Sequence, residues 1–591
     1  MSTRPVSGRH VGQIFFQRAA ELGPRTFIKL QMGERFENIS WQDFAALARN
    51  VMLGLMTLGI APGETIAIIG ENSLPWLAAD LATLSAGFPN VVLAPALSDM
   101  MLLKVLGHAE CRIAFVQDSV GVGRLLNLKG QLPALKYIIS MDASEMNLPH
   151  ALSFAALTRQ GKSVEAQRLS TLMEGVHPND LATIIYTSGS TGEPKGVMRT
   201  QDNLLANITN GGPVALSAPE ELTVNLLSLN HLFGRFGFLK SAVTGRTTAL
   251  VEAVDTRADL RVIERLAPTA LAVVPRIMER IWEGVLNQDG NDALWRELES
   301  YDGPVALKRC DAETARRMGE LCARLGSNTR RALGGRIKYI AYGGAAMPPR
   351  IMRFFELIGL PLIGSYGVTE CGGVTLCGLG ENRPGNLGRP FANVELCIAD
   401  DGEVLVRGPT VSPGYFKNPQ ATAEAFDEQG WFHTGDFGAI DADGSLRITG
   451  RKKDVFNCAE GSNIYPSLIE LQLENEPFIS QAILVGDRRP FVAALIVPDR
   501  QKIAAAANRE ARELSDEIIQ AALWKQIDRV NGRLEQYERI RRITVLARDF
   551  PAEVRSINQF QKVKVDRSAA GALYHKEIEA MYAGRPTGGA L

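Results

Sequence analysis

The sequence predicts an α/β protein built from a large N-terminal domain and a smaller C-terminal domain. Short apolar strands alternate with amphipathic helices over the first half, which is typical of parallel-rich sheets flanked by helices. Paired strand signals then gather near residues 390–450, and a mixed α+β pattern follows. We therefore expect domains at residues 1–450 and 451–591, with a small antiparallel β unit at the end of the first.

The elements of the first half are predicted by local signals. Ser40 and Asp43 resemble a capping box that opens an amphipathic helix to about Leu58, and Gly59 ends it. Strands are expected at residues 65–69, 90–94 and 112–117, with a helix over residues 73–86. Because these strands are almost continuously apolar, the sheet should be covered by helices on both faces.

Three hairpins are predicted in the second half. Residues 394–399 and 403–407 flank Asp400-Asp401-Gly402, and residues 437–440 and 445–449 flank a second Asp/Gly turn. Residues 482–485 and 492–497 form the third pair, around a turn at residues 488–490, and residues 515–534 have a helical period. The last two features are typical of a separate α+β domain.

Composition excludes several classes of function. The 591 residues carry 64 Lys+Arg and 65 Asp+Glu, so 64 − 65 gives a net charge of −1, which disfavours nucleic acid as a partner. The 7 cysteines are scattered, which disfavours a disulfide framework or a zinc site. We see no signal peptide, and the longest apolar stretch, residues 74–97, is broken by prolines and glycines. No transmembrane segment is expected, and the default location is the cytoplasm.

The strongest chemical signal is residues 186–197, Tyr-Thr-Ser-Gly-Ser-Thr-Gly-Glu-Pro-Lys-Gly-Val, which follow an apolar strand. Glycines let backbone N–H groups approach an anion, hydroxyls add donors, and Lys195 adds a positive charge, so the loop suits a polyphosphate. It is not a Walker A loop, because Pro194 precedes the lysine and Gly196 follows it. The alternative is a flexible surface loop without a ligand.

This loop resembles the phosphate loop of the acyl-adenylate-forming superfamily, which includes acyl-CoA synthetases, adenylation domains and luciferases. Three further segments match in the family's order: residues 364–370 the adenine and magnesium motif, residues 431–436 the ribose motif, and residues 450–470 the hinge segment. The resemblance covers nearly the whole chain. It implies a barrel-like β subdomain, a mobile C-terminal lid, and the use of ATP, Mg²⁺ and coenzyme A.

The resemblance also implies residue roles. Tyr366 would stack on adenine, Thr369 would donate to the α-phosphate, and Glu370 would hold Mg²⁺. Asp436 would accept hydrogen bonds from the ribose hydroxyls, and Arg451 would reach the ribose or a phosphate. Taken singly, Tyr366 could equally be a core aromatic and Asp436 a turn former. The remaining binding residues implied are Thr187, Ser188, Gly189, Ser190, Gly192, Lys195, Gly344, Gly367, Lys453 and Gly461, with Thr191 catalytic.

The implied reaction has two steps. A carboxylate attacks the α-phosphorus of ATP to give acyl-AMP and pyrophosphate, and a thiol then displaces AMP. The first step joins two anions, so a cation should supply much of the catalysis, and in the family a C-terminal lysine does so. Lys564, three residues before Arg567, fits the long-chain pattern; Lys562 is the alternative, and either could be a solvated strand residue. Lys453 occupies the family's pivot position, although a solvated charged turn is the simpler interpretation.

The acid is expected to be a medium- or long-chain fatty acid. His231 matches the mouth of the family's acyl pocket, with a structural histidine as the alternative, and residues 343–347 resemble the pocket lining. Residues 274–281 and the helical stretch 295–331 resemble long-chain synthetases, whereas residues 556–559 resemble feruloyl-type enzymes. The alternatives are therefore an aryl-acid:CoA ligase, an acyl-AMP ligase that loads a carrier protein, and a non-catalytic nucleotide-binding protein. The oligomeric state is open, with a homodimer as one option.

Overall fold

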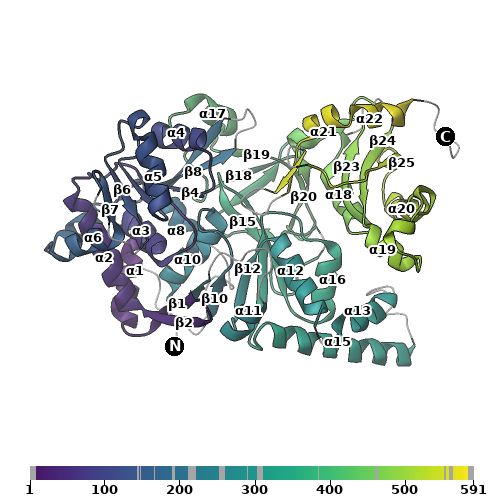
Figure 1. Cartoon of the computed structure of the whole chain (residues 1–591), viewed down its shortest axis with the longest axis horizontal. Helices are drawn as coiled ribbons and strands as arrows, with labels where there is room; N and C mark the ends of the chain where they lie inside the picture. Colours follow the sequence, from purple (N-terminus) through teal and green to yellow (C-terminus); the bar gives the residue numbers. More distant parts are fainter. Residues whose placement is uncertain are drawn as a thin grey trace. The chain divides into compact units, whose positions relative to one another are not determined.

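The computed structural model divides the chain into two compact units (Figure 1). Unit 1 comprises Met1–Ala345, Phe354–Leu396 and Leu405–His433, and unit 2 comprises Ala346–Arg353, Cys397–Val404 and Thr434–Leu591. The structure describes residues 8–142, 146, 148–165, 167–188, 193–209, 221–251, 260–288, 290–301, 311–383, 385–458, 463–551, 554–557 and 563–583.

A seven-stranded sheet carries the phosphate-loop hairpin. Its strands, in spatial order, are β7 (Ala151–Ser153), β6 (Tyr137–Ser140), β5 (Ile113–Val116), β3 (Ile66–Ile69), β4 (Asn90–Leu93), β8 (Leu181–Ser188) and β9 (Pro194–Thr200). All neighbours are parallel except β8 and β9, which form an antiparallel hairpin. The strands predicted at residues 65–69, 90–94 and 112–117 are thereby confirmed, as is their parallel arrangement.

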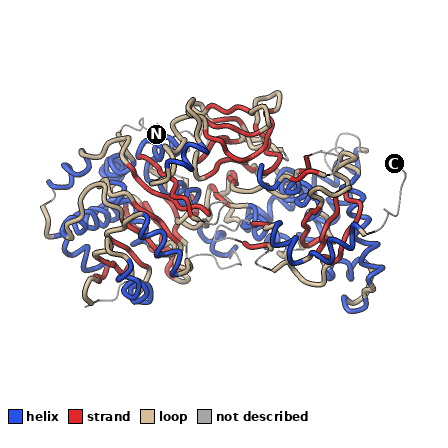
Figure 2. The backbone as a smooth tube through the Cα atoms, turned by 90° about the horizontal axis from the view of Figure 1, so that it is seen from above, coloured by secondary structure: helices blue, strands red, loops and turns tan. Residues whose placement is uncertain are grey.

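Helices bury both faces of this sheet, as the apolar strands predict. Ile66 and Ile68 face a core shared with α2 (Trp41–Thr57) and α3 (Leu74–Ser85), whereas Ala67 and Ile69 face α4 (Asp99–His108) and α5 (Ser119–Leu128). Figure 2 shows strands enclosed by helices in this part of the chain. Ser40 caps α2 by accepting from the Asp43 N–H at 3.1 Å, and its hydroxyl donates to the Asp43 carboxylate at 2.5 Å. The predicted Ser40 cap is therefore confirmed, and the Asp43 carboxylate accepts a hydrogen bond from the Ser40 hydroxyl.

A second sheet of unit 1 has nine strands and a parallel centre. Its order is β16 (Arg389–Pro390), β15 (Gly372–Leu376), β14 (Leu362–Val368), β13 (Tyr339–Gly343), β12 (Ala270–Val273), β10 (Leu222–Asn225), β11 (Thr247–Leu250), β1 (Thr26–Met32) and β2 (Arg35–Ser40). The strands from β14 to β1 are parallel, and antiparallel pairs close both edges. The carboxyl ends of the parallel strands all lie on one side of the sheet. Residues that follow these strands are therefore gathered on that side.

Unit 1 contains further described helices. α1 (Val11–Leu22), α8 (Gln201–Thr209) and α10 (Leu232–Thr244) contribute to the core that also holds α2 and α3. The others are α6 (Phe154–Lys162), α7 (Gln167–Glu174), α11 (Leu260–Leu266), α12 (Pro275–Leu286), α13 (Asn291–Ser300), α15 (Ala312–Ala332) and α17 (Pro419–Ala425). The predicted helical stretch at residues 295–331 corresponds to α13 and α15.

The predicted hairpins near residues 390–450 are present. β17 (Glu395–Ile398), β18 (Glu403–Arg407), β19 (Phe432–Ile440) and β20 (Leu446–Arg451) form a four-stranded sheet in that order, and β19 and β20 are antiparallel. α16 (Pro349–Leu357) lies in the chain between β13 and β14.

Unit 2 contains a three-stranded sheet with a core on each face. β23 (Ile479–Val485) and β24 (Val492–Pro498) form the third predicted hairpin, and β25 (Ile540–Val545) adds parallel to β24. α18 (Pro466–Glu474), α19 (Arg500–Ala506) and α20 (Asp516–Asn531) pack on one face, and α21 (Arg567–Leu573) and α22 (His575–Tyr582) pack on the other. Unit 2 also contains two small described hairpins: β21 (Phe456–Asn457) with β22 (Asn463–Ile464), and β26 (Arg555–Ile557) with β27 (Val563–Val565).

No described helix is both long enough and apolar enough to cross a membrane.

Candidate active site

The β8–β9 hairpin positions the two ends of the glycine-rich loop. Thr187 pairs with Lys195 and Ser188 with Pro194, so the hydroxyl-bearing strand and the lysine strand run side by side. Thr187 Oγ1 donates to the Lys195 carbonyl at 3.5 Å. The predicted residues Gly189, Ser190, Thr191 and Gly192 lie outside the described residues.

Three segments of predicted site residues follow parallel strands of the nine-stranded sheet. His231 follows β10, Gly344 follows β13, and Thr369 and Glu370 follow β14. The carboxyl ends of parallel strands share one edge of a sheet, which is where open α/β sheets bind ligands. A Cβ on Gly343 would lie 2.7 Å from Ser365 Oγ and 3.8 Å from Phe233 in α10, so the neighbouring strand and the segment after His231 both approach this edge.

The adenine and magnesium motif forms a strand and a tight turn. Tyr366 is 9% exposed, and its stacking on adenine stays a prediction. Gly367 must be glycine, because a Cβ there would lie 2.0 Å from the Gly372 carbonyl oxygen of the paired strand. Glu370 lies in the middle of the turn, and its carbonyl accepts from the Ser412 N–H at 2.7 Å.

Residues 409–416 connect the glutamate to the lysine hairpin. The Met198 N–H donates to the Gly414 carbonyl at 3.1 Å and the Phe416 N–H to the Gly196 carbonyl at 2.8 Å, so this segment runs along the free edge of β9. The Tyr415 hydroxyl donates to Glu370 Oε1 at 2.9 Å, and Lys195 Nζ lies 5.0 Å from the centroid of the Tyr415 ring. Burial and the Glu370 carboxylate raise the pKa of Tyr415, which keeps the hydroxyl protonated as a donor.

Arg199 lies behind this cluster and is fully buried. Its Nη1 donates to the Glu370 carbonyl at 3.1 Å and to the Thr410 carbonyl at 2.8 Å, and burial lowers its pKa to about 10. Within the described part of the chain its Nε and Nη2 have no hydrogen-bond partner. A buried cation bound by carbonyls adds positive potential next to the strand of Lys195 and to Glu370.

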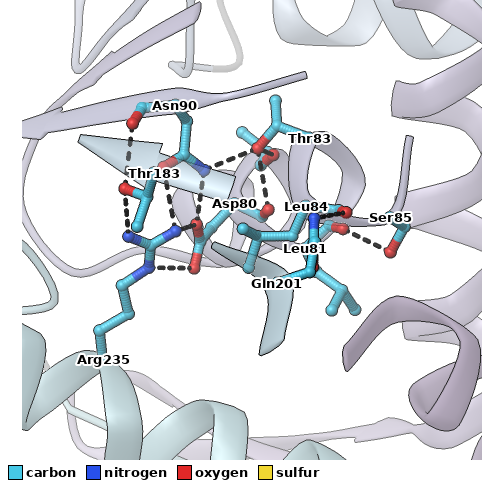
Figure 3. A network of polar contacts seen from close by, with 10 residues as sticks. Asp80, Leu81, Thr83, Leu84, Ser85, Asn90, Thr183, Gln201 and Arg235 are labelled. Carbon is cyan, nitrogen blue, oxygen red and sulfur yellow. Dashed lines mark hydrogen bonds and ion pairs between the residues drawn. The ribbon is translucent and has the colours of Figure 1, made fainter. Parts of the chain in front are cut away.

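A buried polar network fixes the strand that enters the loop and the helix that follows His231 (Figure 3). Arg235 of α10 forms an ion pair with Asp80 of α3, and both side chains are 0% exposed. Arg235 also donates to Thr183 Oγ1 of β8 at 2.8 Å and to Asn90 Oδ1 of β4 at 3.0 Å. The Arg235 N–H in turn bonds the His231 carbonyl at 2.8 Å. The network therefore connects β8, which leads into the predicted phosphate loop, with α10, which follows the predicted acyl-pocket residue His231.

Unit 2 contains the predicted ribose residues. Asp436, 3% exposed, pairs with Arg451 across β19 and β20, and Arg451 Nε lies 2.7 Å from Asp436 Oδ1. Glu403 supports both strands, since its Oε1 accepts from the Gly435 N–H at 2.8 Å and its Oε2 from Lys452 Nζ at 2.9 Å. The Asp401 and Glu403 carboxylates raise the pKa of Lys452. The chain is therefore anchored up to the residue before Lys453.

The structure describes only some of the residues predicted for the hinge and for the catalytic lysine. Lys453 lies in a short 3₁₀ turn, Lys452–Asp454, and Gly461 and Lys562 lie outside the described residues. Lys564 is the central residue of β27 and pairs with Ser556. Arg567 follows and forms a two-pronged ion pair with Glu470 of α18, at 2.7 and 2.8 Å.

Unit 1 thus brings Lys195 and Glu370 together through Tyr415, with Thr187 paired to Lys195 in the hairpin. It also places His231, Gly344 and Thr369 after parallel strands of one sheet. Asp436, Arg451, Lys453 and Lys564 belong to unit 2. Sequence reasoning did not identify Tyr415, Arg199 or Glu403. Each lies in an ordinary strand or turn pattern, and only the pairing of segments far apart in the chain shows its place.

Comparison with known proteins identifies the family of this chain. A family model described as AMP-binding enzyme matches residues 15–416, and one described as AMP-binding enzyme C-terminal domain matches residues 453–586. The chain belongs to the AMP-binding enzyme family. The long-chain-fatty-acid–CoA ligase FadD15 of Mycobacterium bovis is 32% identical, with 92% of each chain covered. The long chain acyl-CoA synthetase 6 of Arabidopsis thaliana is 28% identical over 95% of this chain and 84% of its own length.

Solved structures with the same fold support the assignment of the architecture. The adenylation domain of a carboxylate reductase from Mycobacterium chelonae matches with a TM-score of 0.74 and 21% identity, covering 98% of this chain and 92% of that one. The anthranilate CoA ligase AuaEII matches with a TM-score of 0.73 and 19% identity, covering 98% and 99%. The predicted α/β fold, with its large N-terminal and small C-terminal parts, is thereby confirmed.

The chain is an AMP-forming acyl-CoA synthetase, so the predicted enzyme class and its use of ATP, Mg²⁺ and coenzyme A are confirmed. Its substrates are small molecules, namely a carboxylic acid, ATP and a thiol.

Proposed function

We propose that the enzyme activates a medium- or long-chain fatty acid as acyl-AMP and transfers the acyl group to coenzyme A. ATP binding, the first part of this proposal, is supported by one observation. Lys195 and Glu370 both contact the side chain of Tyr415. A cation beside a carboxylate suits a triphosphate that carries a hard metal ion.

The residues fit magnesium. Mg²⁺ binds through one or two carboxylates together with substrate phosphates, so a single glutamate beside a phosphate site is a sufficient protein contribution. The Glu370 carboxylate accepts from a neutral hydroxyl and has no ion-pair partner among the described residues. Bound there, the ion would supply charge neutralisation at the phosphates.

In the proposed mechanism, the chain's own residues bind and orient the reactants. Lys195 holds phosphate oxygens of ATP, and Thr369 donates to the α-phosphate while the acid's carboxylate attacks its phosphorus and pyrophosphate leaves. Lys564 neutralises the charge that develops between the two anions. Asp436 accepts from the ribose hydroxyls, with Arg451 orienting its carboxylate. In the second step the thiolate of coenzyme A attacks the acyl carbon and AMP leaves.

The fatty acid is the finer part of the proposal. FadD15, at 32% identity over nearly the whole of both chains, is named for long-chain fatty acids, as is ACSBG1 of mouse at 26%. The nine-stranded sheet edge at which Gly344 and His231 lie would receive the acyl chain. A cytoplasmic location, a homodimer, a boundary near residue 450 and the catalytic role of Lys564 over Lys562 stay predictions.

The test is pyrophosphate exchange into ATP over a panel of acids of graded length and aromaticity, followed by detection of thioester with coenzyme A. We expect exchange to peak with fatty acids, and Lys195→Met, which removes the loop cation, to lose it with every acid. A maximum with aryl acids would instead support the aryl-acid ligase. Exchange without any thioester would support carrier loading, and no exchange with any acid would contradict the proposal.

A further inference from the structure

Tyr415 lies where two segments distant in sequence meet at the candidate phosphate site. Its backbone forms a β-bridge with Val197 of the lysine strand, and its side chain is only 7% exposed. Gly414 gives it this position, since φ there is +135° and a Cβ would lie 2.5 Å from Thr422. The Thr422 hydroxyl accepts from the Tyr415 N–H at 2.9 Å, which fixes the backbone from the other side.

The ring and the hydroxyl of Tyr415 contact opposite charges. The hydroxyl donates to Glu370 Oε1 at 2.9 Å, and the ring face lies 5.0 Å from Lys195 Nζ. The ring can attract a cation through its quadrupole without taking any of the ammonium's three donors. The hydroxyl satisfies one lone pair of the carboxylate without bringing a positive charge to it.

An alternative arrangement would weaken the site. If Lys195 and Glu370 paired with each other, binding of a metal–triphosphate complex would first have to separate them. Among the described residues neither side chain forms an ion pair within 4.0 Å. A neutral tyrosine that contacts the cation with its ring and the carboxylate with its hydroxyl keeps the two charged groups separate and oriented before the nucleotide binds.

We propose that Tyr415 is a positioning residue that holds Lys195 and Glu370 apart, ready for the phosphates and the metal ion of MgATP. This rests on the proposed nucleotide function of the two charged residues. In this proposal the ring of Tyr415 orients Lys195, which binds the phosphates. The hydroxyl orients Glu370, which binds the metal ion.

The test measures binding of ATP to the full-length protein by calorimetry, without an acid substrate, once with Mg²⁺ and once with EDTA. Tyr415→Phe keeps the ring and removes the hydroxyl, so MgATP should bind roughly tenfold more weakly while metal-free ATP binds as in the wild type. Tyr415→Leu removes both contacts and should weaken both forms of ATP. Tyr537→Phe, at a tyrosine that is 41% exposed, is the matched control and should change neither.

The outcomes separate this inference from the function on which it rests. Wild-type protein that binds no ATP in either form would overturn the proposed function itself. Wild-type binding with Tyr415→Phe unchanged for MgATP, or weakened equally for both forms, would overturn only the role of the hydroxyl. A thermal unfolding scan of each variant confirms that it is folded. Should Tyr415→Leu fail that scan, the Tyr415→Phe comparison alone decides.

Discussion

Replacing Arg235 by methionine should strongly destabilise unit 1. The guanidinium bonds Asp80 through Nε at 3.0 Å and through Nη2, Thr183 through Nη1 at 2.8 Å and Asn90 through Nη2 at 3.0 Å. Both charged groups are 0% exposed, so methionine would leave the Asp80 carboxylate buried without a counter-charge. Breaking a buried pair in this way costs about 3–5 kcal/mol, a large fraction of a domain's typical stability of about 5–15 kcal/mol.

The assay is urea unfolding followed by tryptophan fluorescence, because Trp41 and Trp76 lie in the core that adjoins the network. We expect a lower midpoint for Arg235→Met at an unchanged slope. The double variant Asp80→Leu/Arg235→Met removes both charges, and it should regain most of the loss because apolar replacement of a whole buried pair is often neutral. An unchanged midpoint for Arg235→Met, or a double variant no more stable than Arg235→Met, would refute this reasoning.

Three further predictions address the proposed lysine, the proposed pivot and a buried histidine. Lys564→Ala should slow adenylation by about 10²–10³-fold and transfer from preformed acyl-AMP much less; equal slowing of both half-reactions would contradict the role, and Lys562→Ala is the comparison. Lys453→Pro should spare adenylation and impair thioester formation by stiffening the pivot, so thioester turnover at the wild-type rate would exclude that pivot. His10 is 1% exposed, burial lowers its pKa from 6.5, and its Nδ1 accepts the first-turn N–H of Gln13, so protonation removes a helix cap. As the pH falls, His10 is protonated at a higher pH in the unfolded state than in the folded state. The free energy of unfolding should therefore decrease below pH 6.5, by about 1 kcal/mol for the lost cap. His10→Asn should reduce this pH dependence, and an unfolding midpoint with the same pH dependence in the variant would contradict the role of His10.

Local signals in the sequence were enough to predict individual elements. The helix predicted over residues 40–58 is Trp41–Thr57, because a serine cap and an apolar stripe specify a helix without reference to the rest of the chain. The hairpin predicted at residues 482–497 is β23 with β24, for the equally local reason that a turn joins two apolar strands. The parallel pairing of β3 with β4 and β5 followed from strands that are apolar on both faces.

Local signals could not predict which strands pair when they lie far apart in the sequence. β25 joins β24 in parallel after a separation that contains two helices, and β1 lies between β2 and β11 although more than 200 residues separate β1 from β11. The site shows the same limit. Arg199 is a charged residue in a strand, which predicts an exposed side chain, yet it is buried against the carbonyls of Glu370 and Thr410. Composition cannot show which distant carbonyls surround a guanidinium.

The contacts within unit 2 bear on how a lysine could be delivered to a reaction. A group carried by a rotating domain reaches its target accurately only if it is fixed firmly to that domain. Arg567 begins α21 three residues after Lys564, and its two-pronged pair with Glu470 ties that point to α18. The pair is mostly buried, with Glu470 also accepting from the Leu484 N–H at 2.7 Å. At the other end, Lys452 is bound to Asp401 and Glu403 just before the proposed pivot. A pivot at Lys453 requires fixed points on both sides of it, and Lys452 before it and Arg567 after it supply them.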